Sequence, residues 1–425
     1  MAKEYMNRIC DQVLQDKLEA KGAVLIKGAK WCGKTTTAEH VARSVIYMED
    51  PAKKQQYLQM ADINPSQLLK GEVPHLIDEW QLAPKLWDAV RFEVDQRDDF
   101  GQFILTGSAV PPESAQISHT GTGRITSLTM RTMSLFESGD SDGSVSLRAL
   151  FSSEHNISGS CDHTLNDIAF LICRGGWPKS IGKSKKVALA QAPDYLDAVI
   201  ESDISRVDGV TRDPERARKV LKAYARSVAS EASLASILND IKADETDTFS
   251  ENTLRSYLTA LRQIFVIEDT NAWNPNLRSK TAIRSSDTRY FVDPSVATAA
   301  LGIGPNDLIN DLSTAGLIFE NLCVRDLRIY ADSLDGKVYH YRDKNGLECD
   351  AVMHLRNGRY GLIEIKLGGD ELIEEGAKNL LALRDSIDDK KMSEPAFMMV
   401  LCGVAPFAYR RSDGVFVVPI GCLRN

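Results

Sequence analysis

The sequence predicts a multidomain α/β protein, and three stretches of the chain carry that prediction. Residues 23–45 combine an apolar strand pattern, a glycine-rich turn and a helical pattern. Residues 213–265 carry apolar side chains at helical spacing, and residues 337–404 contain strand patterns with one further helix among them. With 425 residues the chain is too long for one hydrophobic core, and a prior of about 150 residues per domain indicates about three domains.

The composition, 43% hydrophobic and 26% charged, is typical of a soluble globular protein. A net charge of -8 does not indicate a nucleic-acid partner, which would need a local basic surface. Charges interrupt the amino-terminal stretch, and no apolar run reaches the length of about 18 residues that a membrane span needs. The eight cysteines include no Cys-x-x-Cys pair and no histidine cluster beside them, which indicates reduced thiols. We therefore expect a cytoplasmic protein without a membrane partner.

The glycine-rich turn has the spacing of a phosphate-binding loop. Gly28 and Gly33 are followed by Lys34 and Thr35, which matches the Walker A pattern between a strand and a helix. The glycines let backbone N–H groups curl around phosphates, and the helix presents its positive dipole end. We expect Lys34 to reach the terminal phosphates of ATP, Thr35 to ligate Mg²⁺, and Thr36 to complete the nucleotide site. A chance match in a glycine-rich turn is the alternative.

Two later strand patterns end in polar residues that suit the same site. The stretch VPHLIDEWQ ends a short apolar strand in Asp78 and Glu79, and FILTGSA places Thr106 and Ser108 after another. Ligands of doubly wound parallel sheets collect at the carboxyl ends of the strands. We expect Asp78 to hold Mg²⁺, Glu79 to polarise the attacking water, and Thr106 to sense the γ-phosphate. Solvated acids and a turn hydroxyl are the alternatives.

The order of these motifs, continued by GTGRITSLTMRTMSLFE and ICRGGWP, resembles AAA-type P-loop ATPases of bacteria and archaea that carry a carboxyl-terminal restriction-endonuclease-like domain. The resemblance implies that Arg124 completes the transition state, with Arg131 as the second candidate, because arginine keeps its charge and its fork fits phosphate oxygens. It also implies that Trp177 and Pro178 pack near the adenine. A helix-ending turn with a core tryptophan is the alternative.

The middle of the chain predicts a helix followed by a hairpin, the outline of a winged helix. Arg255 and Arg262 lie seven residues apart on one helix face, and the following loop adds three further cations: Arg278, Lys280 and Arg284. In a winged helix the helix enters the major groove of DNA and the wing touches the backbone. The alternative is a packing or lid module, since winged helices of multidomain ATPases often serve that purpose.

The carboxyl-terminal third predicts a helix and a meander of strands with four charged residues at a hairpin. Side chains alternate along a strand, so Glu364 and Lys366 share one face, and Glu348 and Asp350 share a face of the preceding strand. The hairpin would bring Asp350 close to Glu364. With Glu320 on the preceding helix, this arrangement resembles the PD-(D/E)XK nucleases, although Cys349 stands where proline would precede the aspartate.

In those nucleases the carboxylates hold Mg²⁺ and the lysine positions or deprotonates the attacking water. The resemblance therefore implies a second divalent metal, Mg²⁺ or Mn²⁺, held by Glu320, Asp350 and Glu364, with Lys366 as the catalytic residue. The alternative is a solvated ion pair between Glu364 and Lys366 on an exposed sheet face.

These expectations combine into one domain order: an AAA-type P-loop ATPase core over 1–138, a helical lid and linker over 139–212, a winged-helix-like domain over 213–305, and a nuclease-like mixed α/β domain over 306–425. The expected function is Mg²⁺-dependent ATP hydrolysis coupled to a domain that binds and cleaves DNA. The competing expectation is a nucleotide-driven switch or scaffold whose nuclease-like domain serves binding or homo-oligomerisation.

Overall fold

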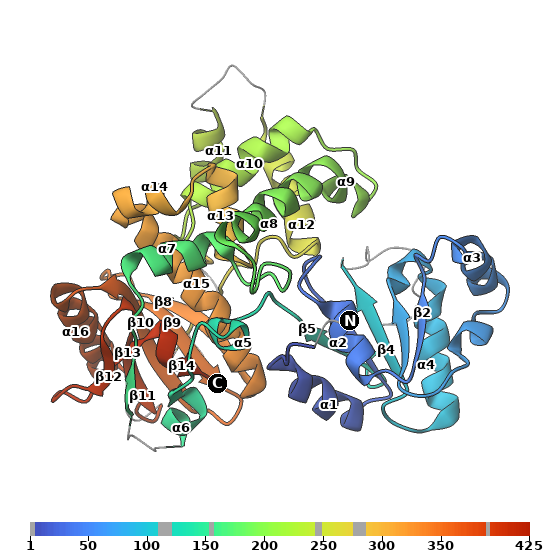
Figure 1. Cartoon of the computed structure of the whole chain (residues 1–425), viewed down its shortest axis with the longest axis horizontal. Coiled ribbons are helices and arrows are strands. Elements are labelled where there is room, and N and C mark those ends of the chain that lie inside the picture. Colours follow the sequence, from blue (N-terminus) through green and yellow to red (C-terminus); the bar gives the residue numbers. More distant parts are fainter. Residues whose placement is uncertain (1–4, 109–120, 153–156, 243–248, 275–285, 388–391) are drawn as a thin grey trace. The chain divides into compact units, whose positions relative to one another are not determined.

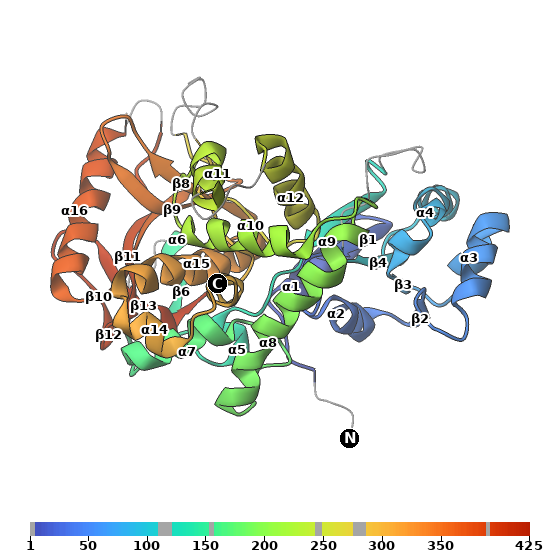
Figure 2. The ribbon, with the colours of Figure 1, turned by 90° about the horizontal axis from the view of Figure 1, so that it is seen from above.

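The computed structural model describes residues 5–108, 121–152, 157–242, 249–274, 286–387 and 392–425 (Figures 1 and 2). The chain forms two compact units. The first contains Met1–Thr132, Asp203–Thr211 and Ala260–Phe265. The second contains Met133–Ser202, Arg212–Thr259 and Val266–Asn425. Within the described residues, no helix is both long and apolar enough to cross a membrane.

A five-stranded, fully parallel sheet forms the first unit, as the sequence predicts. Its strand order is β2-β3-β4-β1-β5. The strands are β1 (Ala23–Lys27), β2 (Ser44–Tyr47), β3 (His75–Asp78), β4 (Phe103–Gly107) and β5 (Ile125–Thr129). The helices are α1 (Cys10–Ala20), α2 (Lys34–Val41), α3 (Lys54–Ile63), α4 (Lys85–Arg97) and α9 (Ile204–Arg206), with the 3₁₀ turns η1 (Pro65–Leu69) and η2 (Trp80–Leu82).

Alternating residues of the central strands cover the two faces of this sheet. Val24 and Ile26 of β1 join the apolar cluster that contains α1 and α2 residues, while Ala23 and Leu25 join the cluster with α4. Both faces are therefore buried, which explains why these strands are almost continuously apolar. Because all the strands are parallel, the carboxyl ends of β1, β3 and β4 meet at one edge of the sheet.

Helices make up the first half of the second unit. They are α5 (Leu135–Ser138), α6 (Leu147–Phe151), α7 (Leu165–Arg174), α8 (Lys185–Ala198), α10 (Pro214–Arg226), α11 (Leu234–Lys242), α13 (Pro294–Leu301) and α14 (Pro305–Asn310), with a π-helical turn η3 (Val199–Asp203) after α8. A further helix, α12, spans Glu251–Gln263. Antiparallel bridges follow it, joining Ile267 to Phe291 and Thr270 to Thr288. The winged helix stays a prediction, because Arg278, Lys280 and Arg284 lie outside the described residues.

The carboxyl-terminal part of the second unit is a mixed seven-stranded sheet, which confirms the expected mixed α/β architecture. Its order is β7-β12-β13-β11-β10-β9-β8. The strands are β7 (Gly159–Ser160), β8 (Gly336–Arg342), β9 (Glu348–Leu355), β10 (Tyr360–Gly368), β11 (Phe397–Val404), β12 (Phe407–Arg410) and β13 (Phe416–Pro419). A two-stranded sheet pairs β6 (Val145–Ser146) with β14 (Leu423–Arg424), next to the 3₁₀ turn η5 (Ile420–Cys422). Val145–Ser146 and Gly159–Ser160, expected in the lid and linker, thus pair with strands near the carboxyl terminus.

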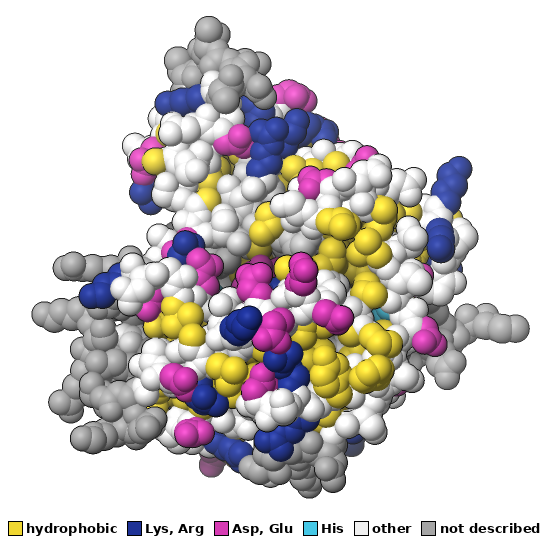
Figure 3. All heavy atoms as spheres, turned by 90° about the vertical axis from the view of Figure 1, so that its left-hand side faces the viewer, with side chains coloured by type: hydrophobic (Ala, Val, Ile, Leu, Met, Phe, Trp, Pro, Cys, Tyr) yellow, Lys and Arg dark blue, Asp and Glu magenta, His cyan; other side chains and the backbone are white. Residues whose placement is uncertain are grey.

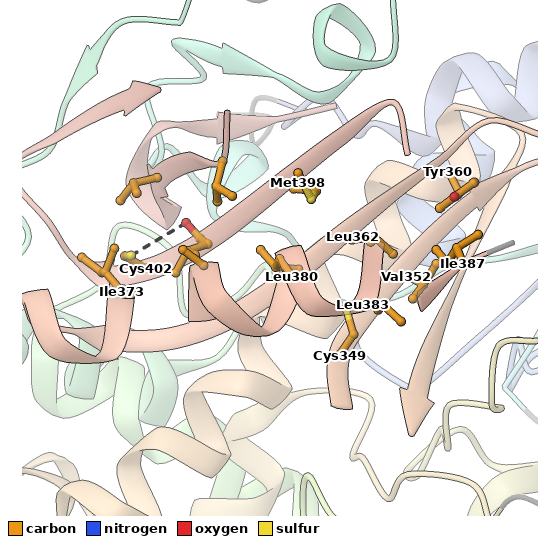
Figure 4. Packing of buried hydrophobic residues seen from close by; sticks show 14 of the residues in the cluster. Cys349, Val352, Tyr360, Leu362, Ile373, Leu380, Leu383, Ile387, Met398 and Cys402 are labelled. Atoms are coloured by element: carbon orange, nitrogen blue, oxygen red, sulfur yellow. Dashed lines mark hydrogen bonds between the residues drawn. The ribbon is translucent and has the colours of Figure 1, made fainter. Parts of the chain in front are cut away.

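Two long helices, α15 (Leu312–Ser333) and α16 (Asp370–Ser386), pack on this sheet. Leu362 of β10 and Leu380 of α16 belong to the apolar cluster on one face (Figure 4). Cys402 lies in that cluster, so the neighbouring Gly403 faces the other side, where the Phe319 ring of α15 approaches within 3.2 Å of its Cβ position. The sheet is therefore covered by α16 on one face and by α15 on the other.

Candidate functional site

The loop between β1 and α2 is built for close approach of a ligand to its backbone. Gly28 and Gly33 have φ values of 154° and 105°, which favour glycine. A Cβ atom at Gly28 would lie 2.0 Å from the carbonyl oxygen of Met130, so a larger residue does not fit there. The Lys34 Nζ atom donates hydrogen bonds to the carbonyl oxygens of Gly28 and Ala29, at 3.0 and 2.9 Å. Lys34 thus folds back over the loop, where it is expected to bind the phosphates of a nucleotide.

Two strands, β3 and β4, and helix α2 contribute to one hydrogen-bonded group beside this loop. Asp78 Oδ1 at the end of β3 accepts a hydrogen bond from Thr35 Oγ1 at 2.7 Å and another from Thr106 Oγ1 at 2.6 Å. Thr36 is exposed in the first turn of α2. A hydroxyl and a carboxylate are the hard oxygen ligands that Mg²⁺ prefers, so these residues fit the expected ion. The structure brings Thr35, Asp78 and Thr106 together as predicted.

Glu79 lies beside this group in a left-handed backbone conformation, with φ of 54°. Its carboxylate accepts hydrogen bonds from Gln81 Nε2 and, at 3.3 Å, from Ser108 Oγ. Burial raises the pKa of Glu79, and the nearby charge of Lys34 opposes that shift. A carboxylate with a raised pKa is better matched to accepting a proton from water near neutral pH.

Arg124 lies at the end of the sheet opposite the phosphate-binding loop of its own chain. Its carbonyl accepts a hydrogen bond at 3.1 Å from Ala23, the first residue of β1, whereas Gly28 follows the last. Its side chain pairs with Asp95 at 2.7 Å. Five strand residues at about 3.3 Å each separate the two ends. Any action of Arg124 on a phosphate must therefore be on another chain.

Two other arginines lie at the loop end of the sheet, and the sequence pointed to one of them. Arg131 follows β5, where the Met130 N–H donates to the Lys27 carbonyl at 2.7 Å. Arg8 was missed: its guanidinium donates to the carbonyl oxygens of Cys32 and Arg131, each at 2.9 Å. Arg8 therefore braces the phosphate-binding loop against the segment after β5. A lone arginine before a helix carries no sequence signal for this long-range contact.

Trp177 is a core residue of the second unit, so the expectation that it packs against adenine is wrong. Its side chain is 1% exposed, its Nε1 donates to Ser295 Oγ at 2.9 Å, and its ring lies 4.4 Å from that of Tyr195. The preceding Gly176 N–H donates to Asp293 at 2.9 Å. The alternative of a helix-ending turn with a core tryptophan is the correct one. Pro178 follows in the same turn, and its role near a nucleotide stays a prediction.

The hairpin of β9 and β10 brings the predicted carboxyl-terminal residues together. Ile363 pairs with Ala351, which places Glu364 beside Asp350. Asp350 Oδ2 accepts a hydrogen bond from the Ile365 N–H at 2.7 Å, and Lys366 Nζ lies 3.0 Å from Glu364 Oε2.

The fourth expected residue, Glu320, accepts a hydrogen bond from the Tyr290 hydroxyl. Glu348 points elsewhere: it is half exposed and pairs with Arg342 at 3.0 Å. The hairpin therefore gathers two carboxylates and one lysine and leaves Glu348 out.

This acidic site is buried, which overturns the alternative of a solvated ion pair on an exposed face. Glu364 is 1% exposed, and its Oε1 has no hydrogen-bond partner among the described residues. Burial is the main cause that raises the pKa of Glu364 to about 8, and the charge of Asp350 adds to it. Burial also raises the pKa values of Asp350 and Glu320. One lysine thus faces three carboxyl groups whose charged forms are disfavoured.

A cavity of about 490 Å³ opens beside these acids. Glu320, Asp350 and Lys366 line it together with apolar residues of α7, α15, α16 and β11: Leu165, Leu312, Leu317, Leu372 and Val404. On the face of the second unit that carries α16, apolar side chains border a mixed group of acidic and basic ones (Figure 3).

Across the described ranges, no three acidic, histidine or cysteine side chains are grouped so that they could hold a metal. The expected second metal site is therefore not preformed.

Comparisons with known proteins define the class of the amino-terminal domain. Residues 20–138 match the family described as an AAA domain, so this part of the chain is a P-loop domain of the ATPase class. Residues 165–307 and 315–423 match two domains of unknown function, DUF8612 and DUF4143. The DUF4143 match covers the acidic site and assigns no activity to it.

Particular relatives are similar along most of the chain. The uncharacterized proteins Rv2008c of Mycobacterium tuberculosis and Mb2031c of Mycobacterium bovis are each 24% identical over 378 residues, which is 87% of this chain and 75% of the relative. Among solved structures, a Walker-type ATPase of Pyrococcus abyssi, PABY2304, is 15% identical, with a TM-score of 0.39 over 68% of this chain and 94% of that chain. A DNA replication initiation factor is 16% identical, with a TM-score of 0.23 over 60% and 92%.

Proposed function

We propose that the amino-terminal domain binds ATP with Mg²⁺ and hydrolyses it. The observation that carries this proposal is the hydrogen-bonded group of Thr35, Asp78 and Thr106 beside the phosphate-binding loop. Thr35 and Asp78 would hold the cation, which, when bound, offsets the charge of the phosphates. The match of residues 20–138 to the AAA domain supports the same conclusion.

The residues around the loop divide the remaining tasks. Lys34 exchanges its hydrogen bonds to two loop carbonyls for bonds to phosphate oxygens. Glu79 orients the attacking water and accepts its proton, because its pKa is raised and its carboxylate is fixed by Gln81 and Ser108. Thr106 donates a hydrogen bond to Asp78 and accepts one from the Glu79 N–H at 3.4 Å. It therefore connects the expected ligand of the cation to the proposed base.

Phosphate release from ATP by the full chain tests this proposal. In Lys34→Ala we expect turnover to fall by on the order of a hundredfold or more, because a charge-stabilising donor is removed from the transition state. Lys30→Ala is the matched control in the same loop, since that side chain is 43% exposed and pairs with Asp203. Equal turnover in both variants and the wild type would exclude this loop as the hydrolytic site.

For the carboxyl-terminal domain we propose a metal-dependent phosphodiesterase that acts on nucleic acid. The supporting observation is the burial of Glu320, Asp350 and Glu364 around Lys366, beside a cavity. Three acids with raised pKa values destabilise the folded chain at neutral pH, and such clusters concentrate at functional sites. A divalent cation would be held by Asp350 and Glu364 once Glu364 leaves Lys366, which then faces the attacking water.

The alternative is a switch or scaffold in which the Lys366 to Glu364 contact stays closed. Cleavage of labelled single-stranded and duplex DNA with Mg²⁺ or Mn²⁺, with and without ATP, separates the two. We expect cleavage by the wild type and its loss in Lys366→Ala, whereas Lys378→Ala, on the exposed face of α16, leaves it unchanged. If the wild type cuts no DNA under any of these conditions, the switch is favoured.

DNA contact by the middle domain is a third element of the proposal. It rests on the expected wing, whose Arg278, Lys280 and Arg284 would touch phosphates. Charge reversal at these three residues should weaken DNA binding and reduce its salt dependence. Unchanged binding and salt dependence would remove the wing from the proposal. Coupling between ATP state and the carboxyl-terminal site, and homo-oligomerisation that brings Arg124 to a neighbouring loop, belong to the same hypothesis.

A further inference from the structure

Two cysteines and a histidine meet in the second unit, outside both candidate sites. Cys161 and His163 lie between β7 and α7, and Cys422 ends η5. The pairing of β7 with β12, and a hydrogen bond of 3.0 Å from the Cys161 N–H to the Pro406 carbonyl, hold the first segment in place. Sequence patterns did not connect the two cysteines, because the second thiol comes from the far end of the chain.

The three side chains lie where two short segments meet, and each sulfur lies against the segment that carries the other. The Cys422 thiol donates a hydrogen bond to the Ser160 carbonyl at 3.6 Å, and a Cβ atom at Gly159 would lie 3.1 Å from the Cys422 sulfur. A Cβ atom at Gly421 would lie 2.6 Å from the Cys161 sulfur and 2.9 Å from His163 Nδ1. Only glycine lets the η5 backbone pass so near both groups. All the cysteines lie among described residues as free thiols, so Cys161 and Cys422 are a dithiol in this structure.

The electrostatic setting of Cys161 differs from that of other buried thiols in the same unit. The neighbouring Cys422 side chain, and after it His163, lower the pKa of Cys161, despite its burial. Contact with Cys161 raises the pKa of His163, as expected for a thiolate beside an imidazolium. By contrast, burial raises the pKa values of Cys173, Cys323 and other core thiols. A thiolate is the nucleophilic form, so Cys161 is the reactive member of the pair.

We propose that Cys161 and Cys422 form a redox-active dithiol that hydroperoxides oxidise to a disulfide, with His163 as the proton carrier. The Cys161 thiolate attacks the peroxide, the O–O bond breaks, and His163 protonates the departing oxygen, which leaves a sulfenic acid on Cys161. The Cys422 sulfur then attacks the sulfenic sulfur, the S–O bond breaks and water leaves. Two thiols and one molecule of hydrogen peroxide thus give one disulfide and two molecules of water.

The disulfide would fix the start of α7 to the carboxyl-terminal turn. Thr164 caps α7 through Asp167, and Leu165, its first residue, lines the cavity beside the acidic site. Oxidation would therefore tie one wall of that cavity to η5. The bond would also close a long chain segment, which restricts the unfolded state. A higher thermal midpoint of the oxidised protein is the expected physical consequence.

Intact mass and peptide mapping after treatment of the full chain with hydrogen peroxide test the proposal. We expect a loss of two mass units and a disulfide-linked peptide pair containing Cys161 and Cys422. Cys422→Ser should instead trap a sulfenic acid that a dimedone probe labels on Cys161. Cys173→Ser, a buried thiol of α7, is the control that leaves the pair intact. Since a serine variant could fail to fold, the mapping of the wild type decides on its own.

The rate of oxidation tests the role of His163. His163→Asn should slow disulfide formation at least tenfold at pH 7 and recover at pH 9, where the thiol ionises without the imidazole. The groups that act on the pair are Asp140 and Asp167 beside His163, and Asp142 beside Cys422. Absence of the Cys161 to Cys422 peptide, or equal oxidation of Cys173, would overturn the proposal. A rate that is the same in His163→Asn at both pH values would remove His163 from it.

Discussion

Each compact unit carries a candidate site in which a lysine and acidic side chains gather beside the strands of a sheet. In the first, Asp78 is held by two hydroxyls, and Lys34 by two backbone carbonyls. In the second, Lys366 lies 3.0 Å from Glu364, so the lysine and one carboxylate form an ion pair with each other. The difference teaches that the first site can accept a nucleotide and cation by exchanging neutral partners, whereas the second must first open an ion pair.

The largest effect is expected at Glu79, the proposed general base of the first site. Glu79→Gln should lower ATP turnover by roughly a hundredfold to ten-thousandfold and leave nucleotide binding intact, because the amide cannot accept the proton. Phosphate release and fluorescent-nucleotide titration measure the two quantities. Since the pKa of Glu79 is raised, turnover in the wild type should fall with acidity at a pH above the usual range for glutamate.

Glu72→Gln is the control for this variant, because that exposed residue precedes β3 and lies outside the hydrogen-bonded group. Full turnover in Glu79→Gln would assign the proton acceptor to another residue.

The second effect concerns the free energy of unfolding of the second unit. The pKa of Glu364 is about 8 in the folded chain, well above its ordinary value of 4.5. Stability from this group is therefore fully present below about pH 4.5 and is lost as the pH rises through 8. In the wild type the free energy of unfolding should fall by on the order of a few kcal/mol between pH 5 and pH 9 because of this group. Glu364→Gln should abolish that fall, as measured by urea unfolding at each pH.

Glu374→Gln, on the exposed face of α16, is the matched control, because Arg411 lowers the pKa of that residue. An unchanged pH dependence in Glu364→Gln would show that Glu364 is charged in the folded chain, and the contrast between the two sites would weaken.

A smaller effect sharpens the assignment of Trp177 to the core. Trp177→Phe removes the hydrogen bond to Ser295 and leaves a buried hydroxyl without its donor, which costs about 1 to 3 kcal/mol. The KM for ATP should not change. Thermal unfolding and steady-state turnover measure the two quantities. A KM that rises while the thermal midpoint is unchanged would restore Trp177 to the nucleotide site.

The smallest effect is expected for Arg124. Its pairing with exposed Asp95 contributes little to stability, so Arg124→Ala should leave the thermal midpoint nearly unchanged. Turnover of the dilute chain should change less than about twofold, because the side chain lies at the far end of β1. A larger loss that grows with protein concentration would indicate action on a neighbouring chain. A large loss at every concentration contradicts the position found for Arg124.

The sequence predicts local features of these sites well. Gly28, Lys34 and Asp78 follow from a strand, loop and helix whose order is visible in the residues, and side-chain alternation correctly paired Asp350 with Glu364. Long-range contacts were not predictable in the same way. Arg8, and the meeting of Cys161 with Cys422, depend on chain segments that sequence patterns do not connect. Burial also decides between alternatives that share one pattern, as at Trp177 and Glu364.

Nucleotide-dependent binding of Mn²⁺, followed by electron paramagnetic resonance of the full chain with a non-hydrolysable ATP analogue, tests the central claim most directly. The account predicts one tightly bound Mn²⁺ that requires the analogue, is lost in Asp78→Asn and is retained in Asp350→Asn. Asp78 shares its hydrogen bonds with Thr35 and Thr106, so its amide would keep the fold while weakening the cation site. Analogue-dependent Mn²⁺ binding that survives Asp78→Asn would contradict the account.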